Sequence, residues 1–229
     1  MTTPRDQPYL WPIWIVGLLS GDDACEWAPW FKAHFQYERK PPGESLARWK
    51  SDHGAFMADI VTEMMADGWN VFVEDQNKLH IPGTLGTCGG KPDAVCAKGD
   101  VIRIIDGKTG RPKEKDLFQV LFYMWGVLLT AGTKHEHPAV AGRPIDDLVV
   151  EGNLRYKKNQ ERDRLIAPEE LDMEMRLRLR DRVRKAMGPE RPRRTPSRRE
   201  CRFCDITSTD CPDRIDQDEP STEVLTSEF

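Results

Sequence analysis

The sequence lacks a hydrophobic run long enough to cross a membrane. The apolar stretch Leu10–Leu19 covers about half of the roughly 20 residues that a transmembrane helix needs, and Pro12 and Gly17 interrupt it. A mean hydropathy of −0.62 excludes a polytopic membrane protein, so we expect no membrane contact. The stretch also lacks the basic flank and the A-x-A site of a signal peptide. We therefore expect a cytoplasmic protein in which Leu10–Leu19 is a buried strand or loop.

Without an export signal disulfides are disfavoured, so the six cysteines in 229 residues need another explanation. Cys88 and Cys96 fit buried core positions, because free cysteine is among the most buried residue types. The others are one cysteine near the start and a C-x2-C-x6-C group near the end: Cys25, Cys201, Cys204 and Cys211. Two thiolates at C-x2-C spacing can bind one metal, and a third follows within reach.

The sequence has no large excess of one charge, since 34 Lys and Arg face 38 Asp and Glu for a net charge of −4. This average argues against a nucleic-acid partner, but the charge is unevenly distributed. Segment 176–202 has twelve Lys and Arg against three Asp and Glu, a net of +9, and the remaining 22 basic and 35 acidic residues give −13. Such separation indicates a surface that binds a polyanion.

Arginines of this basic segment are the candidate DNA contacts, because guanidinium groups bind phosphates bidentately and without regard to base sequence. They are Arg176, Arg178, Arg180, Arg182, Arg184, Arg193, Arg194, Arg198 and Arg199. A solvated helix face is the alternative interpretation of the same run. Four aromatic residues could stack on unpaired bases, although such residues usually belong to the core: Trp27, Trp30, Phe31 and Tyr156.

Apolar periodicity and turn residues predict an α/β protein. Helices are expected at 20–35, 45–66, 114–130 and from 168 to a stop at 188–189. Strands are expected at 69–74, 78–81, 92–97, 100–106, 148–154 and 163–166, the first four as two hairpins. Segments 1–19, 40–44, 82–90, 132–142 and the linker 189–200 are expected to be irregular, and the acidic tail after Cys211 disordered.

Two short motifs bring carboxylates near a lysine. Asp106 and Lys108 end one predicted strand and face the same side, because alternate residues of a strand point the same way. Asp93 starts the neighbouring strand of the hairpin, so its carboxylate is expected to meet that of Asp106. Two carboxylates held together repel unless a divalent cation lies between them. Such a cation would polarise a phosphodiester, and Lys108 would orient the attacking water or stabilise the developing charge.

Pro92-Asp93 followed by Asp106-Gly-Lys108 resembles the PD-(D/E)XK nuclease superfamily. Gln119 and Tyr123 on the next helix are similar to the Q-x3-Y element of its RecB-like branch, and His53 lies where that branch has a metal-binding histidine. The resemblance implies a restriction-endonuclease-like α/β fold, with a mixed central sheet flanked by helices. It implies the catalytic set Asp93, Asp106, Lys108, Gln119 and Tyr123, and Mg²⁺ or Mn²⁺ bound by His53, Asp93 and Asp106.

The outer cysteines resemble those of iron–sulfur RecB-like nucleases, including CRISPR-associated exonucleases, the AddAB nuclease and related phage proteins. This implies one [4Fe–4S] cluster in a cap that joins both ends of the chain, held by Cys25, Cys201, Cys204 and Cys211. A four-cysteine Zn²⁺ site is the alternative. Two features depart from the pattern: Asp106 stands where this branch more often has Glu, and the x6 spacing before Cys211 is slightly long.

The resemblance implies a Mg²⁺- or Mn²⁺-dependent exonuclease that cuts single-stranded DNA, in a prokaryotic or phage-infected cell. The alternative is a non-cleaving, cluster-containing DNA-binding or adaptor protein of recombination, repair or CRISPR adaptation, and protein partners from such a complex are expected in either case. The expected domains are an irregular segment 1–19, a nuclease domain 20–211 and an acidic tail 212–229. Within the nuclease domain we expect a core at about 45–166, a basic helix and linker at 167–200, and the cysteine trio at 201–211.

Overall fold

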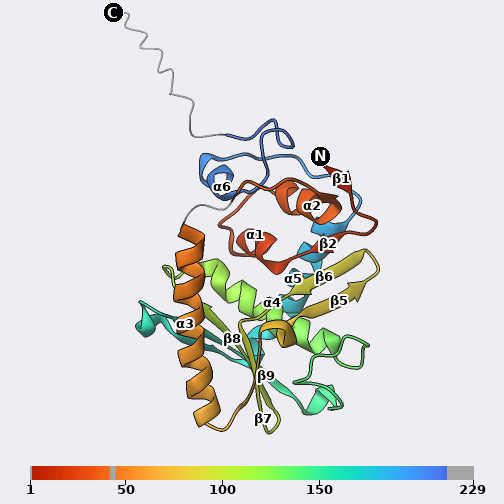
Figure 1. Ribbon diagram of the computed structural model, residues 1–229. Helices are drawn as coiled ribbons and strands as arrows, with labels where there is room; N and C mark the ends of the chain where they lie inside the picture. Colours follow the sequence, from red (N-terminus) through yellow and green to blue (C-terminus); the bar gives the residue numbers. More distant parts are fainter. Residues whose placement is uncertain (1, 42–44, 216–229) are drawn as a thin grey trace, which may run out of the picture.

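The computed structural model describes residues 2–41 and 45–215, which form an α/β structure with three sheets flanked by helices (Figure 1). The strands are β1 (Thr3–Pro4), β2 (Tyr9–Leu10), β3 (Phe35–Gln36), β4 (Asn70–Val73), β5 (Leu79–Gly83), β6 (Gly86–Gly90), β7 (Ala94–Lys98), β8 (Val101–Lys108), β9 (Val149–Tyr156) and β10 (Arg164–Ile166). The α-helices are α1 (Val16–Ser20), α2 (Trp27–His34), α3 (Ser45–Ala66), α4 (Glu114–Thr130), α5 (Met173–Met187) and α6 (Arg198–Phe203).

The central sheet has five strands in the order β10-β9-β8-β7-β4. β8 and β9 are parallel, and the other neighbours are antiparallel. The parallel pair is connected through α4, because parallel neighbours need a crossover between them. This mixed sheet with flanking helices confirms the restriction-endonuclease-like fold expected from the sequence.

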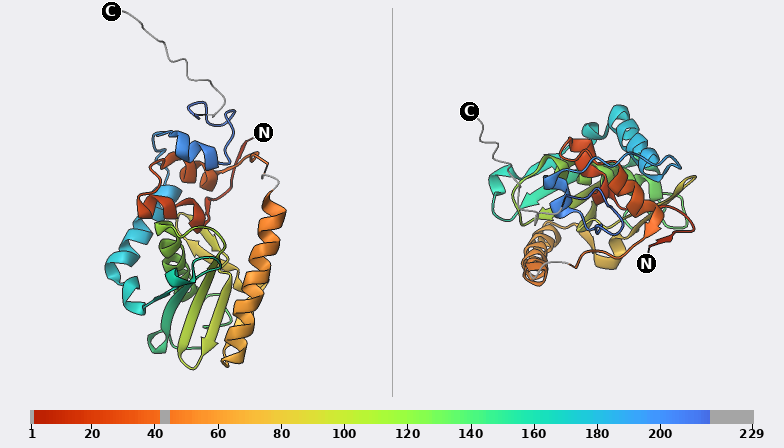
Figure 2. Two further views of the ribbon diagram at one scale, coloured as in Figure 1. Left: turned by 90° about the vertical axis from the view of Figure 1, so that its left-hand side faces the viewer. Right: turned by 90° about the horizontal axis from the view of Figure 1, so that it is seen from above.

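Helices cover the two faces of the central sheet (Figure 2). α3 packs through Met57, Ile60 and Met64 against one face, as its apolar periodicity predicts. α4 packs against the other face in the larger core cluster. Consecutive strand residues alternate between these layers, since Ala94 belongs to the α3 cluster and Val95 to the α4 cluster. Side chains of both helical layers can therefore reach the place where β7 begins and β8 ends.

The two ends of the described chain meet in a cap at one end of the molecule (Figures 1 and 2). α2 and the segment after α6 share an apolar cluster that contains Trp30 and Ile206. Asp205 adds polar contacts, because Lys32 Nζ lies 2.6 Å from its Oδ1 and the Tyr37 hydroxyl donates to its Oδ2 at 3.0 Å. Trp30 Nε1 donates to the carbonyl of Gly188 at 3.0 Å. These contacts join the N- and C-terminal segments, as the sequence led us to expect.

The N-terminal segment is more regular than the sequence indicated. β1 pairs with β3, and β2 lies parallel to β6 in a three-stranded sheet. Leu10–Leu19, expected as strand or loop, contains only the last residue of β2 and is mostly helical, with a 3₁₀ turn at Pro12–Trp14 and most of α1; its apolar side chains are largely buried. Gly21 adopts a φ of 80° and ends α1. The helix predicted from Ser20 therefore begins only at Trp27, and Ser20 is the last residue of α1.

The hairpin predicted for 69–81 is wrong. β4 pairs with β7 in the central sheet, whereas β5 pairs with β6 in the second sheet. Segment 86–90, predicted as a loop from its glycines, is strand β6. A Cβ on Gly89 would lie 1.9 Å from the Tyr9 hydroxyl oxygen, and one on Gly90 would lie 3.1 Å from Tyr123 Cε1. These glycines permit close approach of aromatic side chains rather than forming a turn.

Several elements confirm the sequence prediction closely. α3 and α4 have the predicted bounds, β7 and β8 form the predicted hairpin, and β9 and β10 lie where strands were expected. α5 ends before Gly188 as predicted, although a 3₁₀ turn at Pro168–Leu171 precedes it. The loop at 40–44 and the acidic tail fall largely on 42–44 and 216–229, outside the described residues. No helix in the described part of the chain is long and apolar enough to span a bilayer.

Candidate active site and cysteine centre

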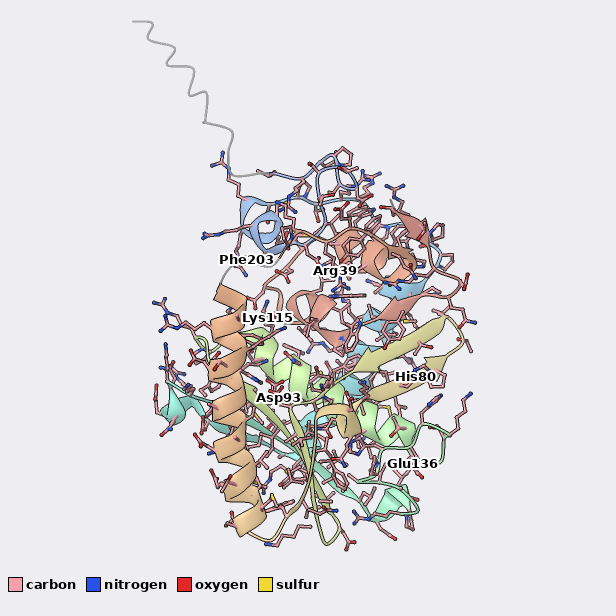
Figure 3. The ribbon with its side chains drawn as sticks, in the orientation of Figure 1. Arg39, His80, Asp93, Lys115, Glu136 and Phe203 are labelled. Carbon is pink, nitrogen blue, oxygen red and sulfur yellow. The ribbon has the colours of Figure 1, made fainter. Side chains whose placement is uncertain are left out.

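The predicted catalytic side chains gather where the β7–β8 hairpin meets both helical layers. Ala94 pairs with Ile105, so Asp93 lies opposite Asp106 when the register is extended by one residue. Asp93 lies beside α3, below the cap (Figure 3). The hairpin thus brings together two carboxylates that are thirteen positions apart in the sequence.

Asp106, Lys108, Gln119 and Tyr123 form one hydrogen-bonded network. Asp106 is only 2% exposed, and its Oδ2 lies 2.6 Å from Lys108 Nζ. Gln119 joins the two residues, because its Oε1 accepts from Lys108 Nζ at 2.9 Å and its Nε2 donates to Asp106 Oδ1 at 3.1 Å. The Tyr123 hydroxyl oxygen lies 3.3 Å from the same Nε2. The glutamine of α4 therefore holds both charged groups of β8 in place.

The site carries more negative than positive charge. Burial raises the pKa of Asp106; Lys108 opposes this effect, and the carboxylates of Asp93 and Asp116 raise the pKa further. Burial lowers the pKa of Lys108, but the Asp106 carboxylate outweighs burial and keeps the lysine charged. Three carboxylates around one half-buried lysine leave an excess that a cation would neutralise. Carboxylates are the hard oxygen donors that Mg²⁺ and Mn²⁺ prefer, so the residue types present fit either ion.

His53 reaches this site from α3. Its Nε2 lies 3.2 Å from Asp93 Oδ2 and 3.1 Å from the Gly107 carbonyl oxygen. Both neighbours are acceptors, so Nε2 carries a proton in this arrangement. The hydrogen bond to Asp93 raises the pKa of His53 against the effect of burial. Metal binding through Nε2 would require release of that proton.

Gly107 allows α3 to approach β8 closely enough for this contact. A Cβ at this position would lie 2.5 Å from Met57 Sδ and 3.3 Å from a ring carbon of Phe56. Its N–H also donates to Asp93 Oδ2 at 2.8 Å. The glycine between Asp106 and Lys108 therefore sets the position of the helix that carries His53.

Two buried polar residues that the sequence did not single out hold the backbone of Asp93. Asn77 Nδ2 lies 3.2 Å from the carbonyl oxygen of Pro92 and 3.3 Å from that of Asp93. His137 Nδ1 accepts from Ala139 N–H at 3.1 Å, so its Nε2 donates to Asn77 Oδ1 at 3.2 Å. Burial lowers the pKa of His137 to about 4. Nothing in the local sequence around either residue signals this burial.

Four cysteines line one small cavity of about 40 Å³ in the cap: Cys25, Cys201, Cys204 and Cys211. None forms a disulfide. Burial raises the pKa of the Cys211 thiol, Arg194 opposes this, and the other three thiols raise it further because they are close. In the described ranges, no group of three or more His, Cys, Asp or Glu side chains could hold a metal ion as they are now placed. Soft sulfur donors converging on one cavity fit a zinc ion or an iron–sulfur cluster.

Cys88 and Cys96 are buried away from this cavity, on β6 and β7. Burial raises the pKa of each thiol to about 12. Both are therefore core residues, as the sequence indicated.

The nine candidate arginines divide by their contacts. Six have partners within the protein: Arg176 with Leu171, Arg178 with Leu19, Arg180 with Asp181, Arg182 with Glu26, Arg194 with Asp213, and Arg199 with Asp22. Arg194 also lies over the Trp27 ring, 4.4 Å from its centroid. The side chains of Arg180, Arg184, Arg193 and Arg198 are exposed. Much of the basic segment thus contributes contacts within and around the cap.

The aromatic residues suggested for base stacking are buried. Trp27, Trp30 and Phe31 lie in the apolar cluster of the cap, and Tyr156 donates to Asp116 Oδ2 at 3.2 Å inside the core. Their rings are covered by other side chains, so that suggestion was wrong.

Comparison with known proteins assigns a family to most of the chain. A family model described as the PD-(D/E)XK nuclease superfamily matches residues 19–211. A search of curated proteins gives no match. Among solved structures, that of SSO0001 is 13% identical in sequence, covers 93% of this chain and 91% of its own, and superimposes with a TM-score of 0.47.

Proposed function

Because the chain belongs to the PD-(D/E)XK nuclease superfamily, we propose that it is a metal-dependent DNA exonuclease of the RecB-like iron–sulfur branch. The observation that carries this proposal is the network of Asp106, Lys108 and Gln119, with Asp93 on the adjacent strand. Resemblance of the Q-x3-Y element and the cysteine spacing to that branch supports single-stranded DNA, cut from an end, as the substrate.

Each residue of the site has a proposed role. His53, Asp93 and Asp106 would hold Mg²⁺ or Mn²⁺, which when bound would polarise the scissile phosphate and lower the pKa of a bound water. Lys108 remains charged and would orient the attacking water or stabilise negative charge on the phosphate. Gln119 fixes Lys108 and Asp106 relative to each other, and Tyr123 orients Gln119.

The cysteine cavity supports a structural [4Fe–4S] cluster, with Zn²⁺ as the alternative. The four candidate ligands are Cys25, Cys201, Cys204 and Cys211, all of which line that cavity. Because they come from opposite ends of the chain, the bound group would close a long loop and hold the cap on the nuclease core. We propose that residues 20–211 act as one nuclease domain on this basis, with the strands of the first 19 residues added to it.

Digestion of end-labelled single-stranded oligonucleotides with Mn²⁺ tests the proposal. The wild type should degrade linear strands and leave circular single strands intact. Lys108→Ala should reduce the rate by about 10²–10³-fold, as expected when a charge-stabilising group is removed. Lys98→Ala is the matched control, because Lys98 ends β7 away from the site and donates to the Asp67 carbonyl.

Equal digestion by wild type and Lys108→Ala would contradict the proposed chemistry. No digestion by either protein with Mg²⁺ or Mn²⁺, together with retained DNA binding, would favour the non-cleaving adaptor instead. Cleavage of circular strands would show that the protein is an endonuclease, because a circular strand has no end from which an exonuclease can start.

A further inference from the structure

Trp49 is an exposed aromatic residue next to the candidate metal site. Its side chain is 48% exposed. The ring centroid lies 5.2 Å from that of His53, one helical turn further along α3, with 31° between the ring planes. His53 in turn contacts Asp93 through Nε2. Trp49 thus borders the site and still presents a large part of its surface to solvent.

Basic residues flank this tryptophan in the sequence, and another lies at the end of β9. Arg48 and Lys50 are its exposed neighbours on α3. Lys157 follows β9, and its backbone N–H donates to the Lys108 carbonyl at 2.9 Å. The Lys157 ammonium reaches α3, where it lies 3.3 Å from the Asp52 carbonyl oxygen and 3.6 Å from the Asp52 carboxylate, which offsets part of its charge. A polyanion approaching Lys108 would therefore meet positive charge chiefly from Arg48 and Lys50 of α3.

Exposure alone does not distinguish Trp49, because single exposed apolar residues are common. Met65 on the same helix is 62% exposed, but it lies more than four turns away along α3. Trp49 differs from Met65 in three ways that concern recognition: it has a flat ring, it contacts a site residue, and it has cationic neighbours. An aromatic face combined with cations is the arrangement that binds unpaired nucleotides.

We propose that Trp49 stacks on an unpaired base of the DNA strand and holds that strand in the active site, while its basic neighbours contact adjacent phosphates. The proposal rests on the nuclease function proposed above and adds a base-binding subsite. Bases in a duplex already stack on their neighbours, so this contact selects single strands or frayed ends. Because every base has a π-face, the subsite is tolerant of sequence.

Cleavage kinetics of single-stranded oligonucleotides test this subsite. Trp49→Ala should raise KM about tenfold, which lies within the range for loss of one base–aromatic stack, and Trp49→Phe should restore much of the loss. Met65→Ala is the control and should leave KM unchanged. Thermal unfolding should be similar for all variants, because both side chains are exposed.

A series of oligonucleotides with one abasic site each identifies the stacked base. At one position the abasic site should raise KM for the wild type but add little to the KM of Trp49→Ala. An unchanged KM in Trp49→Ala, or equal penalties for abasic sites in both proteins at every position, would overturn the subsite. Lys108-dependent digestion by the wild type would remain intact in that case, so the proposed function would stand. If the wild type neither cuts nor binds DNA, both proposals fall.

Discussion

The candidate active site, where β7 begins and β8 ends, is called the edge below, and the four-cysteine region is the cap. Both form where separate segments meet, but the segments of the cap lie much further apart along the chain than those of the edge. At the edge, all of the candidate residues except His53 lie between Asp93 and Tyr123, on one hairpin and the helix after it. In the cap, Cys25 meets residues 201–211 from the opposite end. A hairpin closes with little loss of chain entropy, whereas the cap closes a very long loop. We therefore expect the edge to keep its geometry with local support and the cap to depend on what bridges it.

The two regions also differ in the chemistry of their donors. The edge has carboxylates and an imidazole, which suit a hard divalent cation that keeps water ligands. The cap has four thiols, which suit soft metals or a cluster. Loss of the bound group should consequently affect catalysis at the edge and folding at the cap.

The largest effect is expected from the cap cysteines. Cys204→Ala should lose iron and the broad visible absorption of the wild type, and should lower the thermal midpoint strongly, because metal-binding free energy in such sites is also folding free energy. Cys96→Ala is the matched control; it should retain iron and lose about 1–2 kcal/mol of stability from a small core cavity. Iron content, the spectrum of anaerobically purified protein and thermal unfolding measure the outcome.

A wild type that contains neither iron nor zinc, together with equal midpoints for the two cysteine variants, would remove the distinction between cap and core. Zinc without a visible band would keep the distinction and replace the cluster by the alternative metal.

At the edge, Asp93→Asn should abolish most activity while preserving the fold. We expect a fall of about 10²–10³-fold in rate, since the substitution removes a charged group proposed to bind metal beside the phosphate. Stability should change little, because the variant also removes repulsion with buried Asp106. Digestion across a Mn²⁺ titration and thermal unfolding measure these two quantities. Asp100→Asn, on an exposed residue at the other end of the same hairpin, is the control.

The difference between edge and cap would be lost if Asp93→Asn destabilised the protein as Cys204→Ala is expected to do. Unfolding of Asp93→Asn at the temperature of the assay would show that the carboxylate is needed for folding. Full activity would show that it binds no essential metal.

His137 makes the support behind Asp93 sensitive to acid. The unfolded chain binds this proton near pH 6.5, whereas burial delays binding in the folded protein to about pH 4. The unfolded state therefore holds more protons in this window, and the free energy of unfolding falls as the pH falls from 6.5 to about 4. The shift corresponds to about 3 kcal/mol. His137→Gln should be less stable at pH 7 but lose less stability on acidification, and His135→Gln, on a more exposed histidine, should change the slope less than His137→Gln does.

Urea unfolding at several pH values measures this slope. An unchanged slope in His137→Gln would mean that other groups account for the acid sensitivity.

The smallest effects should come from the arginines, and they should divide by contact. Arg184→Ala, on an exposed side chain, should reduce the slope of log affinity against log salt by about 0.7 for single strands. Arg182→Ala, which loses the ion pair with Glu26, should leave that slope unchanged and cost about 1 kcal/mol or less of stability. Fluorescence anisotropy at several salt concentrations and thermal unfolding separate the two. The reverse pattern would mean that Arg182 contacts DNA and that Arg184 stabilises the fold.

Local patterns were the reliable part of the sequence prediction. The bounds of α3 and α4 follow from periodicity and terminating residues, and the β7–β8 hairpin follows from two apolar runs around Lys98-Gly99. Alternation along β8 placed Asp106 and Lys108 on one side, and the structure has them in contact. Helical spacing placed His53 on the face of α3 that meets the sheet.

Predictions that depended on long-range packing were less successful. β4 and β5 are adjacent in sequence but join different sheets, because their partners β7 and β6 come later in the chain. The glycines of β6 looked like a loop until the aromatic rings beside them were known. The same limit applies to exposure, since Trp27 and Trp49 are both tryptophans near helix starts and only one is buried.

By itself, the sequence determined which chemistry the chain offers: a pair of carboxylates with a lysine, four outer cysteines, and the order of the motifs. These are properties of residue type and short spacing, and neighbouring residues decide them. Only the tertiary structure decided that Asn77 and His137 support Asp93, that several of the arginines pair with residues of the cap, and that Trp49 is exposed beside the candidate active site. The burial of a side chain and the identity of its contact partners depend on segments that are distant in the chain. No local sequence pattern indicates which of these segments pack together.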